Sequence, residues 1–504
     1  MRHPFTATEP ALTQSLGKRM ASSAAWMVGF RLIERVLGFL STLVLARLLL
    51  PADFGLVAMA MAIFATLEIM GSFSFDLALI QNQNAEDRHF NTAWTFTVLF
   101  GAASALVLCA LAAPAAAFYN EPRVETILYC LALSAFIQGF ENIGLVTFQK
   151  ELKLAKEVKF RLAKKVMGIA VAIPLAFLLR NYWALVAGMI VSRVAGVGFS
   201  YLVHPYRPKL SLSARNELFH FSKWMLFNNI LIFLVVKGVD FVIGKLAGPT
   251  ALGLYTVAYE VSNLPTTELV FPIGRAVFPG YAQMASDVNR LREGYVNVLA
   301  VIAIFAVPAG TGIVVLAEPI VRVLLGERWL GTVVLIQWLG LFGILRACTS
   351  NIGSIYLALG RPRIIAGLAL VTIAVMTPIL ILLLPVHGAL AAAWALLAAS
   401  GIGLPLNFWL LRKLLHLRMS AVMQVIWRPV VASLLMAAAV SAARWVPLEN
   451  RVIDLFADVM LGVVVYIGST MMLWWLSRSP AGGESMLLQA IAGKLKRMRI
   501  ASAG

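Results

Sequence analysis

The sequence predicts an all-α, polytopic membrane protein with about 14 transmembrane helices. Of its 504 residues, 60% are hydrophobic and only 13% are charged. Soluble globular domains carry about 25% charged residues, so this much apolar surface requires a lipid bilayer as its solvent. The apolar residues are gathered into runs of about 20, the length that spans a hydrocarbon core. The first half of the chain also resembles the second half, as the parallel repeats of some transporters do.

Fourteen apolar runs follow one another along the chain with short connections. Because this number is even, both termini are expected on the same side of the membrane. The N-terminal 20 residues lack the short apolar core and small-residue cleavage site of a signal peptide. The predicted helices are 21–46, 54–80, 92–118, 124–147, 160–179, 182–203, 218–246, 251–276, 295–317, 330–358, 362–384, 388–411, 422–445 and 452–476.

The net charge of +18 is explained by orientation. Lys and Arg are enriched in cytoplasmic loops. With alternate connections assigned to alternate sides, the side of the N-terminus receives 29 of the 42 basic residues, the opposite side 8 and the helix interiors 5. Both termini are therefore predicted to be cytoplasmic. The basic runs are expected to contact anionic lipid, and no nucleic-acid partner is predicted, because these runs lack interleaved aromatic residues.

One short turn occurs twice, with an offset of 198 residues. Pro51 and Gly55 of the first copy match Pro249 and Gly253 of the second copy. A proline after a helix prevents its continuation, and a glycine permits a close or left-handed backbone, so these four residues are predicted to shape turns. Six predicted helices separate the two copies. The repeats therefore run in the same direction through the membrane.

The run LARLLLPADFGLVAMA at 45–60 and its weaker echo KLAGPTALGLYTVAY at 245–259 resemble a known family. With 14 predicted helices in 504 residues, the chain looks like the polysaccharide transporter branch of the multidrug, oligosaccharidyl-lipid and polysaccharide exporter superfamily, and within it like the Wzx or WzxC type of flippase. The resemblance implies two six-helix lobes, at 1–210 and 211–415, that face each other around a central cavity. Helices 13 and 14, at 416–476, would pack outside, and a basic cytoplasmic tail would occupy 477–504.

The resemblance also implies a function. A flippase of this type translocates undecaprenyl-diphosphate-linked oligosaccharide repeat units, for O-antigen or exopolysaccharide, across the bacterial inner membrane by alternating access. Its partners would be this substrate, membrane lipids, and the polymerase and chain-length proteins of the same pathway. No cofactor is expected.

Charged residues inside predicted helices are the candidates for function, because charge within lipid is expensive and usually faces a cavity or a partner. Arginine suits a diphosphate because its planar fork donates two hydrogen bonds at once. The alternative is that these groups pair among themselves, as Glu34 could with Arg31 or Arg35, and Lys237 with Asp240. Candidates for the substrate cavity are Arg31, Glu34, Arg35, Arg193, Lys237, Asp240 and Arg346, and candidates for proton or ion coupling are Glu68, Asp76, Glu141, Glu260 and Glu268.

Several kinds of chemistry lack a motif in this sequence. There is no GxxxxGK[ST] phosphate loop, HExxH motif or GxSxG elbow, so we expect neither ATP hydrolysis, a metal site nor an enzyme. A polysaccharide polymerase or ligase is one alternative, but the connections on the outer side are too short for a catalytic domain. A cation-coupled multidrug exporter of the same superfamily is the other alternative. The last two helices and the arginines of the first helix argue against it.

Overall fold

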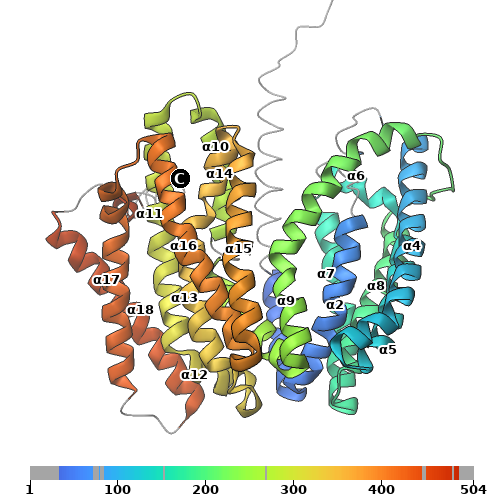
Figure 1. Ribbon diagram of the computed structural model, residues 1–504, viewed down its shortest axis with the longest axis horizontal. Coiled ribbons are helices and arrows are strands. Elements are labelled where there is room, and N and C mark those ends of the chain that lie inside the picture. Colours follow the sequence, from blue (N-terminus) through green and yellow to red (C-terminus); the bar gives the residue numbers. More distant parts are fainter. Residues whose placement is uncertain are drawn as a thin grey trace, which may run out of the picture. The chain divides into compact units, whose positions relative to one another are not determined.

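The computed structural model describes residues 33–71, 79, 85–150, 154–266, 270–444, 450–478, 482–486 and 488, without the side chains of 69–71, 154, 216–237, 271–272 and 275–276. The chain forms two compact units, Met1–Thr250 and Ala251–Gly504. Their boundary lies inside a long helix, later than the lobe boundary predicted after residue 210, so the predicted division into lobes remains a prediction. The described part of both units is built from helices (Figure 1).

The first unit begins with a helical segment at 33–48. Its further elements are α2 (Pro51–Gly71), α4 (Asp87–Tyr119), α5 (Arg123–Gly139), η1 (Ile143–Leu145), α6 (Val146–Lys150), α7 (Leu154–Leu179), α8 (Trp183–Val203) and most of α9 (Arg215–Pro265). The helical backbone of α9 is interrupted at Gly248, where φ is 79° and ψ is −178°. This break separates the helices that the sequence predicts at 218–246 and 251–276.

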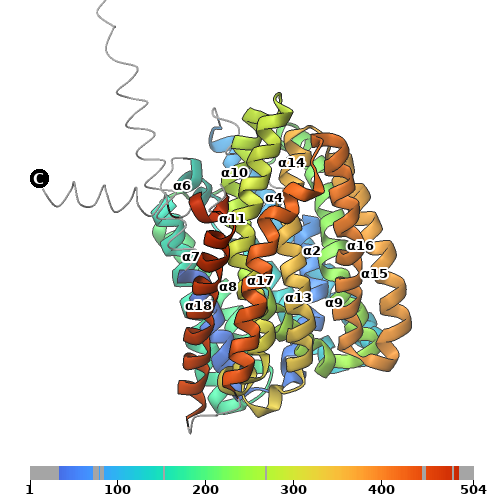
Figure 2. The ribbon, with the colours of Figure 1, turned by 90° about the vertical axis from the view of Figure 1, so that its left-hand side faces the viewer.

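The second unit contains the end of α9 and the remaining helices. These are α10 (Phe271–Met284), α11 (Val288–Val315), α12 (Ala317–Ile320), η3 (Val321–Leu325), η4 (Glu327–Trp329), α13 (Thr332–Ser350), α14 (Ile352–Ala358), α15 (Pro362–His387), α16 (Ala389–Leu415), α17 (Met419–Ala443) and α18 (Arg451–Leu476). The last two helices pack side by side in both views (Figures 1 and 2).

Eleven helices within the described residues are long and apolar enough to cross a membrane, and a twelfth span is added if one bent pair counts as a single span. The chain is therefore a multi-pass membrane protein. The predicted total of 14 stays a prediction, because residues 21–32 of the first predicted helix lie outside the described residues and the side chains of the seventh are described only from Gly238 onward.

The predicted continuous helix at 124–147 is wrong. α5 and the η1–α6 segment are bent by 65° relative to each other across the break at 140–142. At the break Asn142 has an extended backbone, with φ −69° and ψ 115°. Its N–H donates to Ser200 Oγ at 3.0 Å, and its side-chain Nδ2 donates to the carbonyl oxygen of Tyr206 at 2.7 Å. These partners lie on and after α8, so tertiary contacts hold the break.

The turn around Pro51 also differs in detail from its prediction. Pro51 is the first residue of α2, and Asp53 in the first turn accepts from the N–H groups of Leu50 and Tyr182 at 2.9 and 3.0 Å. Gly55 lies inside the helix and does not have a positive φ. A Cβ at this position would overlap the carbonyl oxygen of Pro249, so close approach is the reason for a glycine here.

The same packing pairs recur in the two halves of the chain. The third predicted helix of each repeat packs on the fourth: α4 on α5 in the first half, and α11 on α13 in the second. The fourth also packs on the sixth: α5 on α8 in the first half, and α13 on α16 in the second. In both halves the first of these pairs crosses at glycines that leave almost no room for a side chain, Gly101 with Gly139 and Gly310 with Gly340. Small residues at such crossings are typical of helices that pack in membranes.

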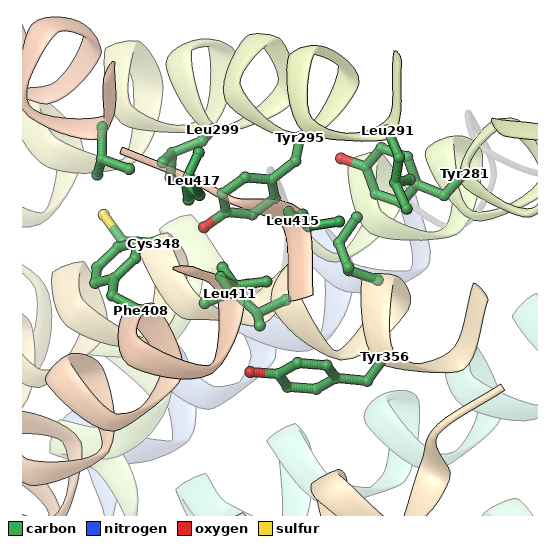
Figure 3. Close-up of a cluster of buried hydrophobic side chains, with 13 residues drawn as sticks. Tyr281, Leu291, Tyr295, Leu299, Cys348, Tyr356, Phe408, Leu411, Leu415 and Leu417 are labelled. Carbon is green, nitrogen blue, oxygen red and sulfur yellow. The ribbon is translucent and has the colours of Figure 1, made fainter. Parts of the chain in front are cut away.

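A cluster of buried side chains joins α10, α11, α13, α14 and α16 at one end of the second unit (Figure 3). Tyr281, Tyr295 and Tyr356 each expose at most 1% of their surface. Leu411 and Leu415 of α16 fill the space between them (Figure 3). This cluster surrounds the junction of α13 and α14.

Candidate functional site

Two predicted site residues of the first unit form one ion pair. Arg193 lies at the middle of α8, and its Nη2 donates to Oε1 of Glu68 on α2 at 2.9 Å. The guanidinium carbon of Arg193 also lies 5.6 Å from the centre of the Phe64 ring, one helical turn before Glu68. Both charged side chains are partly exposed. The sequence-based assignment placed Arg193 in the substrate cavity and Glu68 among the coupling groups, whereas the structure brings the two together.

Glu141 lies in the break between α5 and η1 and has a partner on α7. The distance from Lys164 Nζ to Glu141 Oε2 is 3.1 Å. The neighbouring Lys165 donates from Nζ to the carbonyl oxygen of Glu34 at 2.6 Å. Two lysines of the basic stretch at 150–165 therefore connect α7 to the fourth helix and to the helical segment at 33–48.

A polar group in the second unit is centred on Arg346, in the middle of the span Thr332–Ala358. Its Nη1 donates to the hydroxyl of Tyr259 at 2.5 Å and to Oδ1 of Asn263 at 3.3 Å. Its guanidinium carbon lies 5.9 Å from the centre of the Phe342 ring, which precedes it by one turn of α13. Arg193 and Arg346 thus each lie over a phenylalanine ring, an arrangement that stabilises a guanidinium and restricts its orientation.

The helices that carry this group are locked to each other. Ser262 and Thr266 near the end of α9 donate to the carbonyl oxygens of Ile336 and Gly343 on α13, at 3.3 and 3.2 Å. A side chain at Gly343 would approach the carbonyl oxygen of Ser262 to 3.1 Å. These contacts fix the register in which Tyr259 and Asn263 meet Arg346.

The other predicted site residues are described only in part. Glu34, Arg35, Asp240 and Glu260 are half-buried. Arg31, Asp76, Glu268 and the side chain of Lys237 lie outside the described residues, and so do the proposed pairs of Arg31 with Glu34 and of Lys237 with Asp240. The roles of all these residues stay predictions. Within the described ranges, no group of three or more His, Cys, Asp or Glu side chains could hold a metal ion.

Sequence reasoning missed the residues that hold the arginines. Phe342 precedes Arg346 by four residues, and Tyr259 precedes Asn263 by four, so each pair shares one helix face. This spacing is visible in the sequence, but nothing in it shows which two faces meet. A buried pair between Arg428 of α17 and Glu484, with N–O distances of 2.8 and 3.1 Å, was missed for the same reason.

Comparisons with known proteins agree with this architecture. A family model described as polysaccharide biosynthesis protein matches residues 44–334. The lipopolysaccharide biosynthesis protein WzxC of Escherichia coli strain K12 is 25% identical over 69% of this chain and 71% of its own length. The teichuronic acid biosynthesis protein TuaB of Bacillus subtilis strain 168 is 25% identical over 84% of this chain and 88% of its own length.

Among solved structures, the lipid II flippase MurJ in an inward closed conformation matches with a TM-score of 0.73 and 12% identity, over 89% of this chain and 98% of that chain. At this identity the match shows the fold alone. The family model, in contrast, covers more than half of the sequence. The chain therefore belongs to the polysaccharide biosynthesis protein family, a family of membrane transporters rather than enzymes.

Proposed function

We propose that the chain is a flippase that moves a lipid-linked oligosaccharide, carried on undecaprenyl diphosphate, across the bacterial inner membrane for O-antigen or exopolysaccharide synthesis. The names of its relatives support the class, since WzxC, TuaB and the succinoglycan transport protein ExoT of Rhizobium meliloti all belong to polysaccharide pathways. The observation that carries the proposal for this chain is the arginine held at mid-span in α13.

Arg346 has the chemistry that a diphosphate requires. A guanidinium carries five N–H donors in a rigid planar fork, which matches two phosphate oxygens. Here Tyr259 and Asn263 both accept from Nη1, and the Phe342 ring fixes the plane of the fork. The cost of placing a charge within lipid is high, so a charge at this depth is retained for function or for a partner. We propose that it contacts the diphosphate of the carrier during transport, as do Arg35 and Arg193.

The test uses a strain whose surface polysaccharide depends on this chain. We expect Arg346→Ala to abolish surface polysaccharide and to cause lipid-linked repeat units to accumulate, with normal amounts of the protein in the membrane. Arg346→Lys keeps the positive charge but lacks the planar guanidinium, so this variant should retain only part of the transport activity. Arg328→Ala is the matched control, because this arginine is exposed and lies outside the spans.

The outcomes separate the alternatives. Wild-type polysaccharide in the Arg346→Ala strain would refute the role of this arginine. Purified chain in vesicles that exports cationic drugs but does not flip a lipid-linked oligosaccharide would favour the multidrug alternative.

Proton or ion coupling through the acidic residues is a second part of the proposal. Because Glu68 is paired with Arg193, its protonation would release the guanidinium and so link proton uptake to head-group binding. We expect Glu68→Gln to reduce transport and its dependence on the pH gradient together. Transport by the wild-type chain that is unchanged when the pH gradient is collapsed would exclude proton coupling.

A further inference from the structure

The tripeptide Asn-Ile-Gly occurs in the fourth helix of each repeat, at 142–144 and at 351–353. The two copies occupy equivalent places, because α5 and α13 make the same packing pairs within their own halves. Their conformations differ. Asn142 is extended, and the helix bends by 65° there, whereas Asn351 keeps a helical backbone with φ −79° and ψ −15°, and Thr332–Ala358 forms one span.

In the bent copy, both polar atoms of the asparagine side chain have a hydrogen-bond partner. Oδ1 of Asn142 accepts from the N–H of Gly144 at 2.9 Å, which caps a donor that the broken helix leaves open. Its own N–H donates to Ser200 Oγ, and Nδ2 donates to the carbonyl oxygen of Tyr206. The side chain exposes 1% of its surface. Asn142 therefore stabilises the bend from inside the protein.

The straight copy leaves its asparagine unsatisfied. Asn351 is fully buried, and its Nδ2 donates to the hydroxyl of Tyr281 at 2.6 Å. Its Oδ1 has no hydrogen-bond partner among the residues that the structure describes, and neither does the nearby hydroxyl of Tyr295. A buried acceptor without a partner destabilises the state that contains it. Bending would bring the N–H of Gly353 to this oxygen, as in the first copy.

Only in the bent copy do neighbouring atoms leave no room for a side chain larger than that of glycine. A Cβ on Gly144 would collide with the ring of His204 and approach Tyr206 Cβ to 2.9 Å. A Cβ on Gly353 would meet nothing within 4 Å. In a straight helix a glycine is less favourable than alanine, because it loses more backbone freedom. The straight conformation therefore does not require a glycine at position 353.

We propose that Asn351-Ile352-Gly353 is a hinge that switches α14 between the straight conformation and a bent one like that at Asn142-Ile143-Gly144. Tyr281 holds the straight state, and the unsatisfied Oδ1 of Asn351 favours the bent state. α14 has seven residues, so a bend of 65° would move its far end by about 11 Å. α14 packs on α10 and α15, so the switch would change the packing of these helices at this end of the second unit.

Pulsed electron paramagnetic resonance on spin-label pairs in lipid nanodiscs tests the hinge without any substrate. Leu341 and Leu357 lie 10 residues before and 6 residues after Asn351 and are exposed. Leu133 and Gln149 form a similar pair, 9 residues before and 7 residues after Asn142. Each pair is separated by 16 residues, which corresponds to about 24 Å along a straight helix and about 20 Å across a 65° bend. In the wild-type chain we expect the longer distance to dominate for the first pair and the shorter distance for the second.

Tyr281→Phe removes the acceptor that holds Asn351 straight and should raise the ratio of bent to straight α14 roughly tenfold or more. Tyr295→Phe is the matched control, since its hydroxyl bonds to no described group, and it should leave the distances unchanged. An unchanged Leu341–Leu357 distance in Tyr281→Phe, or the same change in both variants, would overturn the hinge. The Leu133–Gln149 distance reports whether the variant is folded.

A second variant decides the matter if Tyr281→Phe does not fold. Gly353→Ala adds a Cβ that the straight conformation accommodates and that the bent copy excludes at Gly144, so it should remove the minor, shorter Leu341–Leu357 distance. A shorter distance that persists unchanged in Gly353→Ala would overturn the hinge.

Discussion

The buried pair of Arg428 and Glu484 gives a sharp prediction about the C-terminal segment. The two side chains expose only 4% and 3% of their surface and share two hydrogen bonds, at 2.8 and 3.1 Å. The partner residues come from α17 and from the segment 482–486, which the sequence predicts to be part of a cytoplasmic tail. Removing one member leaves the other charge buried and uncompensated.

We expect Glu484→Gln to weaken the docking of this segment by about 3 to 5 kcal/mol, the usual cost of breaking one side of a buried pair. This corresponds to a roughly 100- to 4,000-fold increase in local opening. Hydrogen exchange measured by mass spectrometry on the purified protein reports this opening directly, as lost protection of the amides at 482–486. The double variant Arg428→Leu with Glu484→Leu should recover much of the protection, since it removes both charges.

The control is an exposed pair in the same unit, Asp287 with Arg290, whose side chains expose 48% and 78% of their surface. Arg290→Gln should change protection by less than about 1 kcal/mol. Unchanged protection of 482–486 in Glu484→Gln would show that the ion pair does not hold the segment. Additive effects of the two single changes at Arg428 and Glu484 would lead to the same conclusion.

Two further predictions concern the first unit. Gly55→Ala should lower the amount of folded protein, because the added Cβ overlaps a backbone carbonyl oxygen. Gel filtration of the solubilised protein measures this, with Gly198→Ala as the comparison, since a Cβ there meets nothing within 4 Å. Equal yields of folded protein would mean that the backbone can move aside. Hydrogen bonds from Arg123, at 2.7 and 2.9 Å, hold the pKa of Glu121 below its usual range, so the stability that this pair adds is present at neutral pH and lost as the pH falls through the lowered pKa. Melting temperatures between pH 3 and about 6 should therefore fall less steeply in Glu121→Gln than in the wild type, and parallel curves would contradict this reasoning.

Most spans could be predicted from the sequence, because each is a run of apolar residues long enough for the bilayer. The prediction at 362–384 corresponds to α15 (Pro362–His387), and that at 452–476 to α18 (Arg451–Leu476). The break at Asn142 could not be predicted in this way. No proline lies there, and the same Asn-Ile-Gly is helical at Asn351, so Ser200 and Tyr206 decide the conformation rather than local sequence.

The candidate site shows the same limit. Periodicity indicates which residues share a face of one helix, and it predicts polar faces near Glu68 and Arg346. It cannot show that Arg193 meets Glu68, 125 residues away, or that Glu141 meets Lys164. Because periodicity describes only one helix at a time, the sequence could suggest only pairs of charges on the same helix, such as Glu34 with Arg35. In the described part of the structure, both of these embedded acids have their partner on a different helix.

The contacts of α17 and α18 indicate which parts of the second unit can move. In the first half of α17, Arg428 holds the segment that contains Glu484. Near the connection between α17 and α18, Arg451 contacts Glu327 at 3.0 Å, and Arg444 lies 3.9 Å from both Glu318 and the buried Asp458.

A third contact lies on α18, at about the level of Arg428. The hydroxyl of Tyr466 donates to the carbonyl oxygen of Ile304 on α11 at 2.7 Å. Single exposed pairs contribute little, but contacts near the connection of the two helices and farther along both of them oppose any rotation of the hairpin against α11. If α17 and α18 move with α11 as one body, a local change within the unit must come from helices that lack such fixation. The junction of α13 and α14, with its unsatisfied Asn351 and the open space beside Gly353, is then the place where the second unit can change shape at the least cost.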